Sequence, residues 1–134
     1  MTRVFVDVNI LQDILAKRQD WFNSLTVINF VTQKKIKAFI SSLTIPILWF
    51  LNAKAKDIKK QIQLLTKFIG LVNLDKIIIK KALQDKRFRD FEDAIQYFSA
   101  KQSGCQIIIA RNKKDFPMKD LQILTPEEFL EQLN

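Results

Sequence analysis

The sequence contains no histidine and only one cysteine, Cys105. The lack of histidine excludes imidazole general bases, Ser-His and Cys-His nucleophilic pairs, and histidine-ligated zinc sites. A single cysteine cannot form an internal disulfide and is too little for structural zinc. It fits a reducing compartment, so we expect a cytoplasmic protein. Chemistry on a polar substrate would therefore fall to carboxylates and a hard metal ion such as Mg²⁺ or Mn²⁺.

Glycine and proline are also scarce, with two and three residues among 134. Long loops, linkers and repeats are therefore not expected, and the length fits one domain over residues 1–134. No apolar run reaches the roughly 20 residues that span a bilayer. The first ten residues lack the long uncharged stretch of a signal peptide. We expect no membrane association.

Lysine and arginine outnumber aspartate and glutamate by 22 to 14, which gives a net charge of +8. A basic field of this size attracts polyanions, and nucleic acid is the commonest polyanion in a cytoplasm. A basic surface that only aids solubility explains the same excess equally well.

Apolar periodicity predicts strands that alternate with helices along the whole chain. Because the predicted strands are apolar on both faces, we expect a parallel sheet between two helical layers. The predicted strands are 3–7, 37–41, 71–74, 106–110 and 121–124, and the predicted helices are 10–15, 21–31, 44–51, 58–68, 76–83, 91–102 and 127–133.

Local signals add a few expectations about single residues. Gly70 stands where a helix stop is expected, and Thr125 stands where a helix cap is expected. The Trp49-Phe50 pair suits the core better than a dimer surface. Tyr97 shares a helical side with Asp90 and is expected to border a site there.

Three aspartates fall where a parallel α/β sheet places its sites, beyond the carboxyl ends of the strands. Asp7 closes the first strand, Asp93 lies in the first turn of the helix at 91–102, and Asp115 follows the strand at 106–110. Each alone has a structural explanation as a cap, a dipole partner or a turn residue. Together they predict a carboxylate cluster that needs a cation to offset its repulsion.

Five segments in order, VFVDVNILQDIL, ISSLTIP, DFEDAIQYFSA, IIIARNKKDF and ILTPEEFL, resemble a PIN domain over nearly the whole chain. The resemblance implies a three-layer α/β/α fold with a central parallel sheet and divalent-metal-dependent cleavage of single-stranded RNA. It further implies that the protein is the toxin of a toxin–antitoxin pair, with an antitoxin partner, and a homodimer.

The resemblance also assigns roles to individual residues. Asp7, Asp93 and Asp115 match the metal-binding and catalytic acids of the family. Asn112 matches a further metal-binding polar position, and Asn9 matches the supporting polar position beside Asp7.

The remaining family acid, usually a glutamate after the second strand, aligns with Ile47, and no acidic residue occurs between Asp20 and Asp57. Thr44 is expected to supply a weaker oxygen ligand, and Asp90 or Glu92 to compensate. The loss of this acid leaves open a second interpretation, a PIN fold that binds RNA or protein without cleaving.

Arg111, Lys113 and Lys114 lie beside the acids and are expected to hold RNA phosphates, although a solvated charge run fits them equally well. A phosphotransfer enzyme or receiver domain also places an aspartate after the first strand. Phosphatases of the haloacid-dehalogenase type need a second aspartate where this chain has Asn9. Receiver domains need a further acidic pair around the first loop and a lysine after the last strand, and the sequence lacks both. These two classes are therefore disfavoured.

Overall fold

Five short strands form one parallel sheet at the centre of the computed structural model, which describes residues 1–133. The spatial order is β3-β2-β1-β4-β5, and every neighbouring pair is parallel. The strands are β1 (Arg3–Val6), β2 (Lys37–Ser41), β3 (Gly70–Val72), β4 (Ile107–Ile109) and β5 (Gln122–Leu124). Each coincides with a predicted strand to within three residues, and the predicted parallel sheet is confirmed.

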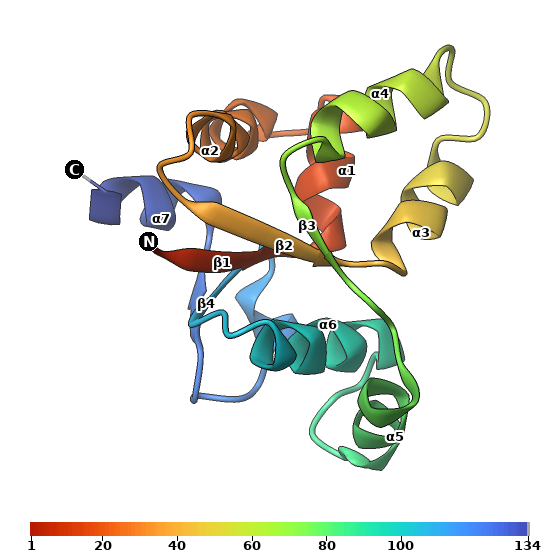
Figure 1. The fold of residues 1–134 in the computed structure, drawn as a ribbon, viewed down its shortest axis with the longest axis vertical. Coiled ribbons are helices and arrows are strands. Elements are labelled where there is room, and N and C mark those ends of the chain that lie inside the picture. The colour runs from red at the N-terminus through yellow and green to blue at the C-terminus, as the bar shows by residue number, and fades with distance from the viewer. Residues whose placement is uncertain (134) are drawn as a thin grey trace.

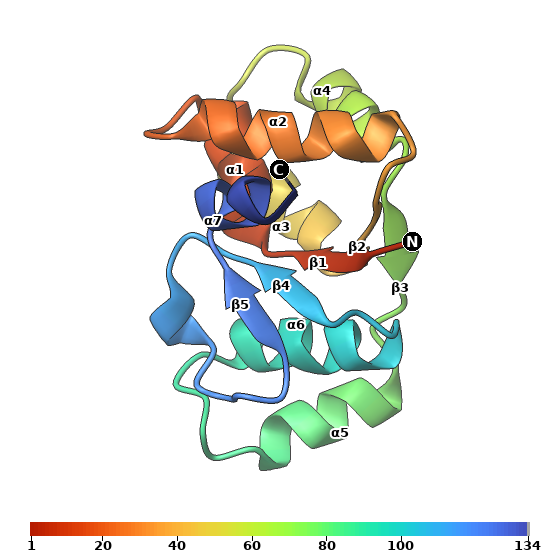
Figure 2. The ribbon, with the colours of Figure 1, turned by 90° about the vertical axis from the view of Figure 1, so that its left-hand side faces the viewer.

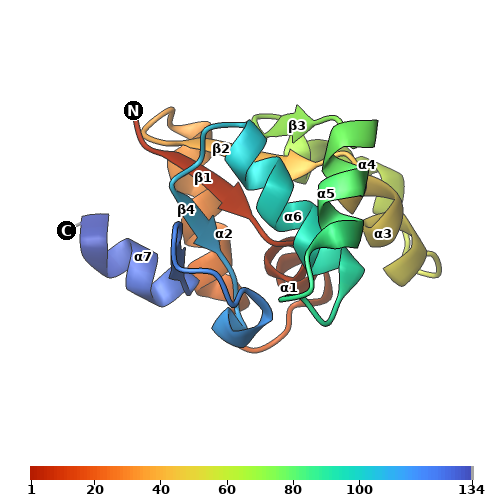
Figure 3. The ribbon, with the colours of Figure 1, turned by 90° about the horizontal axis from the view of Figure 1, so that it is seen from below.

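Seven helices cover the two faces of this sheet in residues 1–133. They are α1 (Val8–Ala16), α2 (Trp21–Thr32), α3 (Thr44–Leu51), α4 (Ile58–Thr66), α5 (Lys76–Gln84), α6 (Phe91–Gln102) and α7 (Pro126–Leu133). One face carries α1 to α4 and α7, and the other carries α5 and α6 (Figures 1 and 2). Viewed from below, α6 lies directly across the sheet with α5 beside it (Figure 3). This is the expected three-layer α/β/α arrangement.

The alternation of side chains along each strand divides the interior into two apolar clusters. In β1, Val4 and Val6 join the cluster beneath α1, α2 and α7, whereas Phe5 joins the cluster beneath α5 and α6. Ile108 in β4 points to the same side as Phe5. Both faces of the central strands are therefore buried, as the continuous apolar runs predicted.

Parallel pairing brings the carboxyl ends of β1, β2 and β4 to one edge of the sheet. Helices α1 and α3 begin there because each follows its strand closely. Helix α6 precedes β4 and runs back along the sheet, so its N-terminus lies at the same edge. A 3₁₀ turn, Lys113–Asp115, follows β4 at this edge. The edge therefore collects segments from both ends of the chain.

Two expectations about single positions are wrong, and one is confirmed. Gly70 does not stop α4, which ends at Thr66; it opens β3, where an added Cβ would lie 2.7 Å from Cδ1 of Phe39. Trp49 and Phe50 are not core residues, since they are 45% and 79% exposed. Thr125 caps α7 as predicted, by accepting a hydrogen bond from the backbone N–H of Glu128 through Oγ1.

None of the helices in residues 1–133 is long and apolar enough to cross a lipid bilayer.

Candidate acidic active-site cleft

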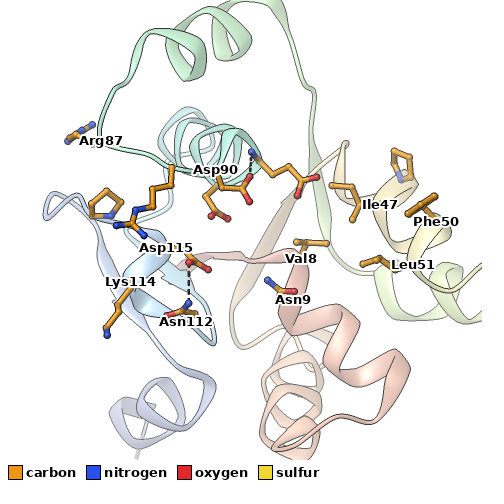
Figure 4. Close-up of a pocket in the computed structure, with 15 residues that line it drawn as sticks. Val8, Asn9, Ile47, Phe50, Leu51, Arg87, Asp90, Asn112, Lys114 and Asp115 are labelled. Carbon is orange, nitrogen blue, oxygen red and sulfur yellow. Dashed lines mark hydrogen bonds between the residues drawn. The ribbon is translucent and has the colours of Figure 1, made fainter.

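A cleft of about 1000 Å³ opens at the carboxyl edge of the sheet (Figure 4). Four segments line it: the start of α1, helix α3, the stretch that leads into α6, and the turn after β4. Asp90, Asp93 and Asp115 are among its lining residues, and Asn9 and Asn112 lie on its floor side. Residues separated by more than 80 positions in the sequence thus share one cavity.

Asp7 lies between β1 and α1, directly before the cleft residues Val8 and Asn9; it does not itself line the cleft and is only 3% exposed. It caps α1, because its Oδ2 accepts a hydrogen bond from the backbone N–H of Asn9 at 3.2 Å. Burial raises the pKa of Asp7 to about 6, against hydrogen bonds from Gln96 and Asn9 that lower it. The negative charge of Asp115 raises the pKa of Asp7 further. A nearby cation would stabilise the charged form of a carboxylate in such a position and lower its pKa.

Gln96 on α6 holds Asp7 in place, and the sequence did not single it out. Its side-chain Nε2 donates to Oδ1 of Asp7 at 2.6 Å, while its Oε1 accepts from the backbone N–H of Val8 at 2.9 Å. Gln96 is buried. Its spacing of three from Asp93 on the same helix was the available signal, because residues i and i+3 share a helical face.

Asp93 lies in the first turn of α6 and is half-buried in the cleft wall. Its pKa is raised to about 7, first by burial and then by the charges of Asp7, Asp90, Asp115 and Glu92. The acids therefore lie close enough to repel one another. Within residues 1–133, however, no three acidic, cysteine or histidine side chains stand close enough together to hold a metal ion as they are placed.

Asp115 and Asn112 come from the turn after β4. Nδ2 of Asn112 donates to Oδ1 of Asp115 at 3.2 Å (Figure 4). Asp90, immediately before α6, also lines the cleft and caps that helix through the backbone N–H of Glu92 at 2.8 Å. The cleft is thus surrounded by carboxylate and amide oxygens from three separate segments.

Comparison with known proteins identifies the family. The PIN domain family model matches residues 3–114. The chain belongs to the PIN-domain family. Ribonuclease VapC1 from Aquifex aeolicus (strain VF5) is 32% identical over 139 residues, covering 98% of this chain and 96% of that protein. The expected family resemblance is confirmed.

Solved structures show the same PIN fold. A toxin–antitoxin complex from Klebsiella pneumoniae matches with a TM-score of 0.69 and 20% identity, covering 92% of this chain and 97% of that one. VapBC2 from Rickettsia felis, bound to a DNA fragment from its promoter, matches with a TM-score of 0.68 and 15% identity, covering 92% and 98%. At these identities the likeness concerns the fold.

Ile47, the residue expected to replace the remaining acid of the PIN domain, lines the cleft. It is half-buried and packs against the apolar cluster beneath α1. Thr44, expected to supply an oxygen there, is buried in a small space behind the cleft and is not among the residues that line it. Glu92 lines both spaces together with Ile47.

The basic residues of this PIN domain are arranged differently from the sequence prediction. Nη1 of Arg111 pairs with the buried Asp13 at 2.9 Å, and Nζ of Lys113 pairs with Glu128 at 3.1 Å. Only Lys114 of the predicted trio lines the cleft. Arg87 and Arg89 line it as well, and the sequence signal for them was the basic stretch KRFRD directly before α6.

Tyr97, predicted to border the site, instead lies in the core beneath α6. Its hydroxyl donates to Oδ2 of Asp120 at 2.7 Å, and its ring packs 5.6 Å from that of Phe88. The ring turns into the apolar layer because the segment before α6 folds over it.

Proposed function

We propose that this PIN domain is an endoribonuclease that hydrolyses phosphodiester bonds of single-stranded RNA with Mg²⁺ or Mn²⁺. The observation that carries the proposal is the placement of Asp90, Asp93 and Asp115 around one cleft, with the buried Asp7 directly before its lining residues Val8 and Asn9. The relationship to ribonuclease VapC1 along almost the full length of both chains supports the same activity.

The donor set fits a hard divalent cation. Carboxylate oxygens of Asp7, Asp93 and Asp115 are the ligands that Mg²⁺ and Mn²⁺ prefer, and Asn112 adds a neutral amide oxygen. A nearby cation would counter both the burial and the negative charges that raise the pKa of Asp93. When bound, such an ion polarises a phosphate oxygen and lowers the pKa of water.

The side chains around the acids would bind and orient the RNA. Asn9 lines the cleft beside Asp7 and can orient a ligand without adding negative charge. Arg89 and Lys114 present cations that attract the phosphates on either side of the cleaved bond. Arg87 is partly neutralised by Asp85, whose Oδ2 lies 2.6 Å from its Nη2.

We further propose that the protein is the toxin of a toxin–antitoxin pair and acts in the cytoplasm, with a cognate antitoxin as partner and a homodimer as its assembly. VapC1 and the solved toxin–antitoxin complexes named above support a toxin role. Co-purification of the product of an adjacent small gene, together with inhibition of RNA cleavage by it, tests this part.

The nuclease activity is tested by incubating single-stranded RNA with the purified protein, with and without Mn²⁺. We expect metal-dependent cleavage by the wild type and at least about a hundredfold loss in Asp93→Asn. Asp57→Asn is the matched control, because Asp57 is exposed, precedes α4 in a left-handed conformation that asparagine also adopts, and lies outside the cleft. Equal rates in Asp93→Asn and wild type would contradict the proposal.

A second candidate is a PIN fold that binds RNA or protein without cleaving it, and Ile47 in the cleft wall favours it. Calorimetric titration with Mn²⁺ separates the two. A binding module shows no uptake at millimolar metal, whereas the nuclease shows uptake that Asp93→Asn removes.

A further inference from the structure

The two long walls of the cleft differ in chemistry. On one side stand Ile47, Phe50 and Leu51 of α3, and on the other stand Arg87 and Lys114, with Asp90 and Asp115 between them (Figure 4). Phe50 is 79% exposed and Leu51 is 49% exposed. An aromatic ring that lines a charged cleft and is nevertheless open to solvent contributes little to folding, so it is available to a ligand.

Phe50 differs from its neighbour Trp49 in this respect. Trp49 is not among the residues that line the cleft, and the ammonium of Lys59 lies 5.8 Å from its ring centroid. Lys59 thus occupies a face of Trp49, whereas Phe50 borders the cavity that also holds the acids.

The two walls match the two sides of a single nucleic-acid strand. Phosphates are attracted to the arginine and lysine wall, while unpaired bases offer flat faces that stack on aromatic side chains. A duplex cannot use the apolar wall in this way, because its bases are already stacked and paired. Asp90 and Asp115 lie between the two walls, so a strand that contacts both walls passes the acids.

We propose that Phe50 is a stacking platform for one unpaired nucleobase next to the cleaved phosphate, with Leu51 and Ile47 extending the apolar wall. The inference rests on the proposed RNA substrate and adds a residue that helps select unpaired strands. Because every base has a π-face, Phe50 favours single-stranded RNA without choosing strongly among the four bases.

The test is a binding measurement in the Asp93→Asn background, which keeps both walls intact and does not depend on cleavage. Fluorescence anisotropy follows an end-labelled single-stranded RNA and a series of copies that each carry one abasic nucleotide. We expect one abasic position to weaken binding roughly tenfold, and Phe50→Ala to weaken binding of intact RNA by a similar factor. The two changes together should weaken binding no more than either alone, because both remove the same contact.

Three further variants sharpen the result. Phe50→Trp should retain binding, because it keeps a stacking face, while Phe50→Leu should lose it although it keeps apolar surface. Phe22→Ala is the matched control, since Phe22 on α2 is 68% exposed and lies outside the cleft. It should leave RNA binding unchanged.

The outcomes distinguish this inference from the proposed nuclease. Suppose that the wild type cleaves RNA with metal, but the losses of RNA binding from Phe50→Ala and from each abasic position are additive. That result overturns the stacking role and supports the proposed nuclease. Coupled losses without cleavage by the wild type overturn the nuclease and leave the stacking role. Full RNA binding by Phe50→Leu overturns the stacking role, because apolar surface without a ring is then sufficient. A Phe50→Ala variant that binds RNA normally and loses only self-association or antitoxin binding assigns the apolar wall to protein contacts instead.

Discussion

Gln96 and Asp7 form a buried hydrogen bond of 2.6 Å between two helices that begin at the same edge of the sheet. The same glutamine accepts the backbone N–H of Val8, so one side chain fixes both the carboxylate and the first turn of α1. Gln96 thus acts on the cleft as a positioning residue from beneath it.

Replacement of Gln96 by leucine should therefore disturb both partners. The Val8 N–H loses its acceptor, which costs about 1–3 kcal/mol of unfolding free energy. Loss of the donor to Asp7 should raise the pKa of Asp7 above its present value of about 6. Carbon-detected NMR titration of the Asp7 carboxyl measures this, with Gln102→Leu on the exposed side of α6 as control. If the pKa of Asp7 does not change in Gln96→Leu, the hydrogen bond from Gln96 does not stabilise the charged form of Asp7.

The raised pKa values predict how the stability of the metal-free protein depends on pH. Asp7 and Asp93 titrate near 3.8 when unfolded but near 6 and 7 when folded, so the folded state holds more protons between these values. The free energy of unfolding from these groups should therefore fall as the pH rises from about 4 to 7, by roughly 2 kcal/mol or more.

Urea unfolding at about pH 4 and about pH 7 tests whether the free energy of unfolding falls as the pH rises. Asp93→Asn should be more stable than the wild type at about pH 7 and lose this advantage at about pH 4. A variant that is less stable than the wild type at neutral pH would mean that the Asp93 charge is not under repulsion. Saturating Mn²⁺ should restore the free energy of unfolding that the wild type loses at neutral pH.

Ile47→Glu places an acid at the position where the resemblance to PIN domains predicts one. With Mn²⁺ present, a carboxylate at the cleft wall should tighten metal binding, raise the melting temperature and speed RNA cleavage. Without metal, the half-buried charge should cost several kcal/mol or take up a proton. Melts and RNA digests with and without Mn²⁺ measure both effects.

Ile45→Glu provides the control for that experiment. Ile45 lies on the same helix and packs against the same apolar cluster but does not line the cleft. Ile45→Glu should destabilise the protein, and Mn²⁺ should not raise the melting temperature of this variant more than that of the wild type. If Ile47→Glu behaves like Ile45→Glu, Ile47 is an ordinary packing residue and the non-cleaving interpretation gains support.

Arg111 should matter for folding more than for RNA. Asp13 is buried, burial raises its pKa, and Arg111 at 2.9 Å and Arg18 at 3.6 Å are the cations that offset this. Arg111→Ala should lower the unfolding free energy by about 1–3 kcal/mol near neutral pH and by less in acid, where Asp13 gains a proton.

Lys114→Ala gives the opposite pattern, because Lys114 lines the cleft and is exposed. It should weaken RNA binding severalfold with little change in stability. Urea unfolding and RNA anisotropy on both variants decide the matter. A stable Arg111→Ala protein with weak RNA binding would restore the phosphate role expected from sequence.

The sequence predicted elements well because periodicity is a local property. Strand β2 and helices α3 and α6 have the predicted bounds, and the order of apolar runs implied the parallel sheet. Periodicity could not predict which face of helix α3 is buried. The helix is apolar nearly all round, so its pattern could not show that Leu48 faces the core while Phe50 faces the cleft.

Site residues were predictable where a residue type and a strand end coincided, as for Asp7 and Asp115. Partners set by tertiary arrangement were not. Nothing in the order of residues 111–114 shows that Arg111 turns to Asp13 on α1 while Lys114 turns to the cleft. Gln96 was missed for a related reason: an amide on the buried face of α6 becomes functional only when β1 places Asp7 beside it.

The central place of β1 has a consequence for how the protein is made. Val4 pairs with Ala38 on one side and with Ile107 on the other. Strand β1 is therefore made long before β4, which is one of its two partners, and pairing over such separations is slow. Asp7 is synthesised well before Asp115, so the acidic cleft assembles only after the turn that follows β4 has been made. A growing chain, or one cut short before the turn after β4, lacks an assembled cleft and therefore lacks the RNA-cleaving activity proposed above.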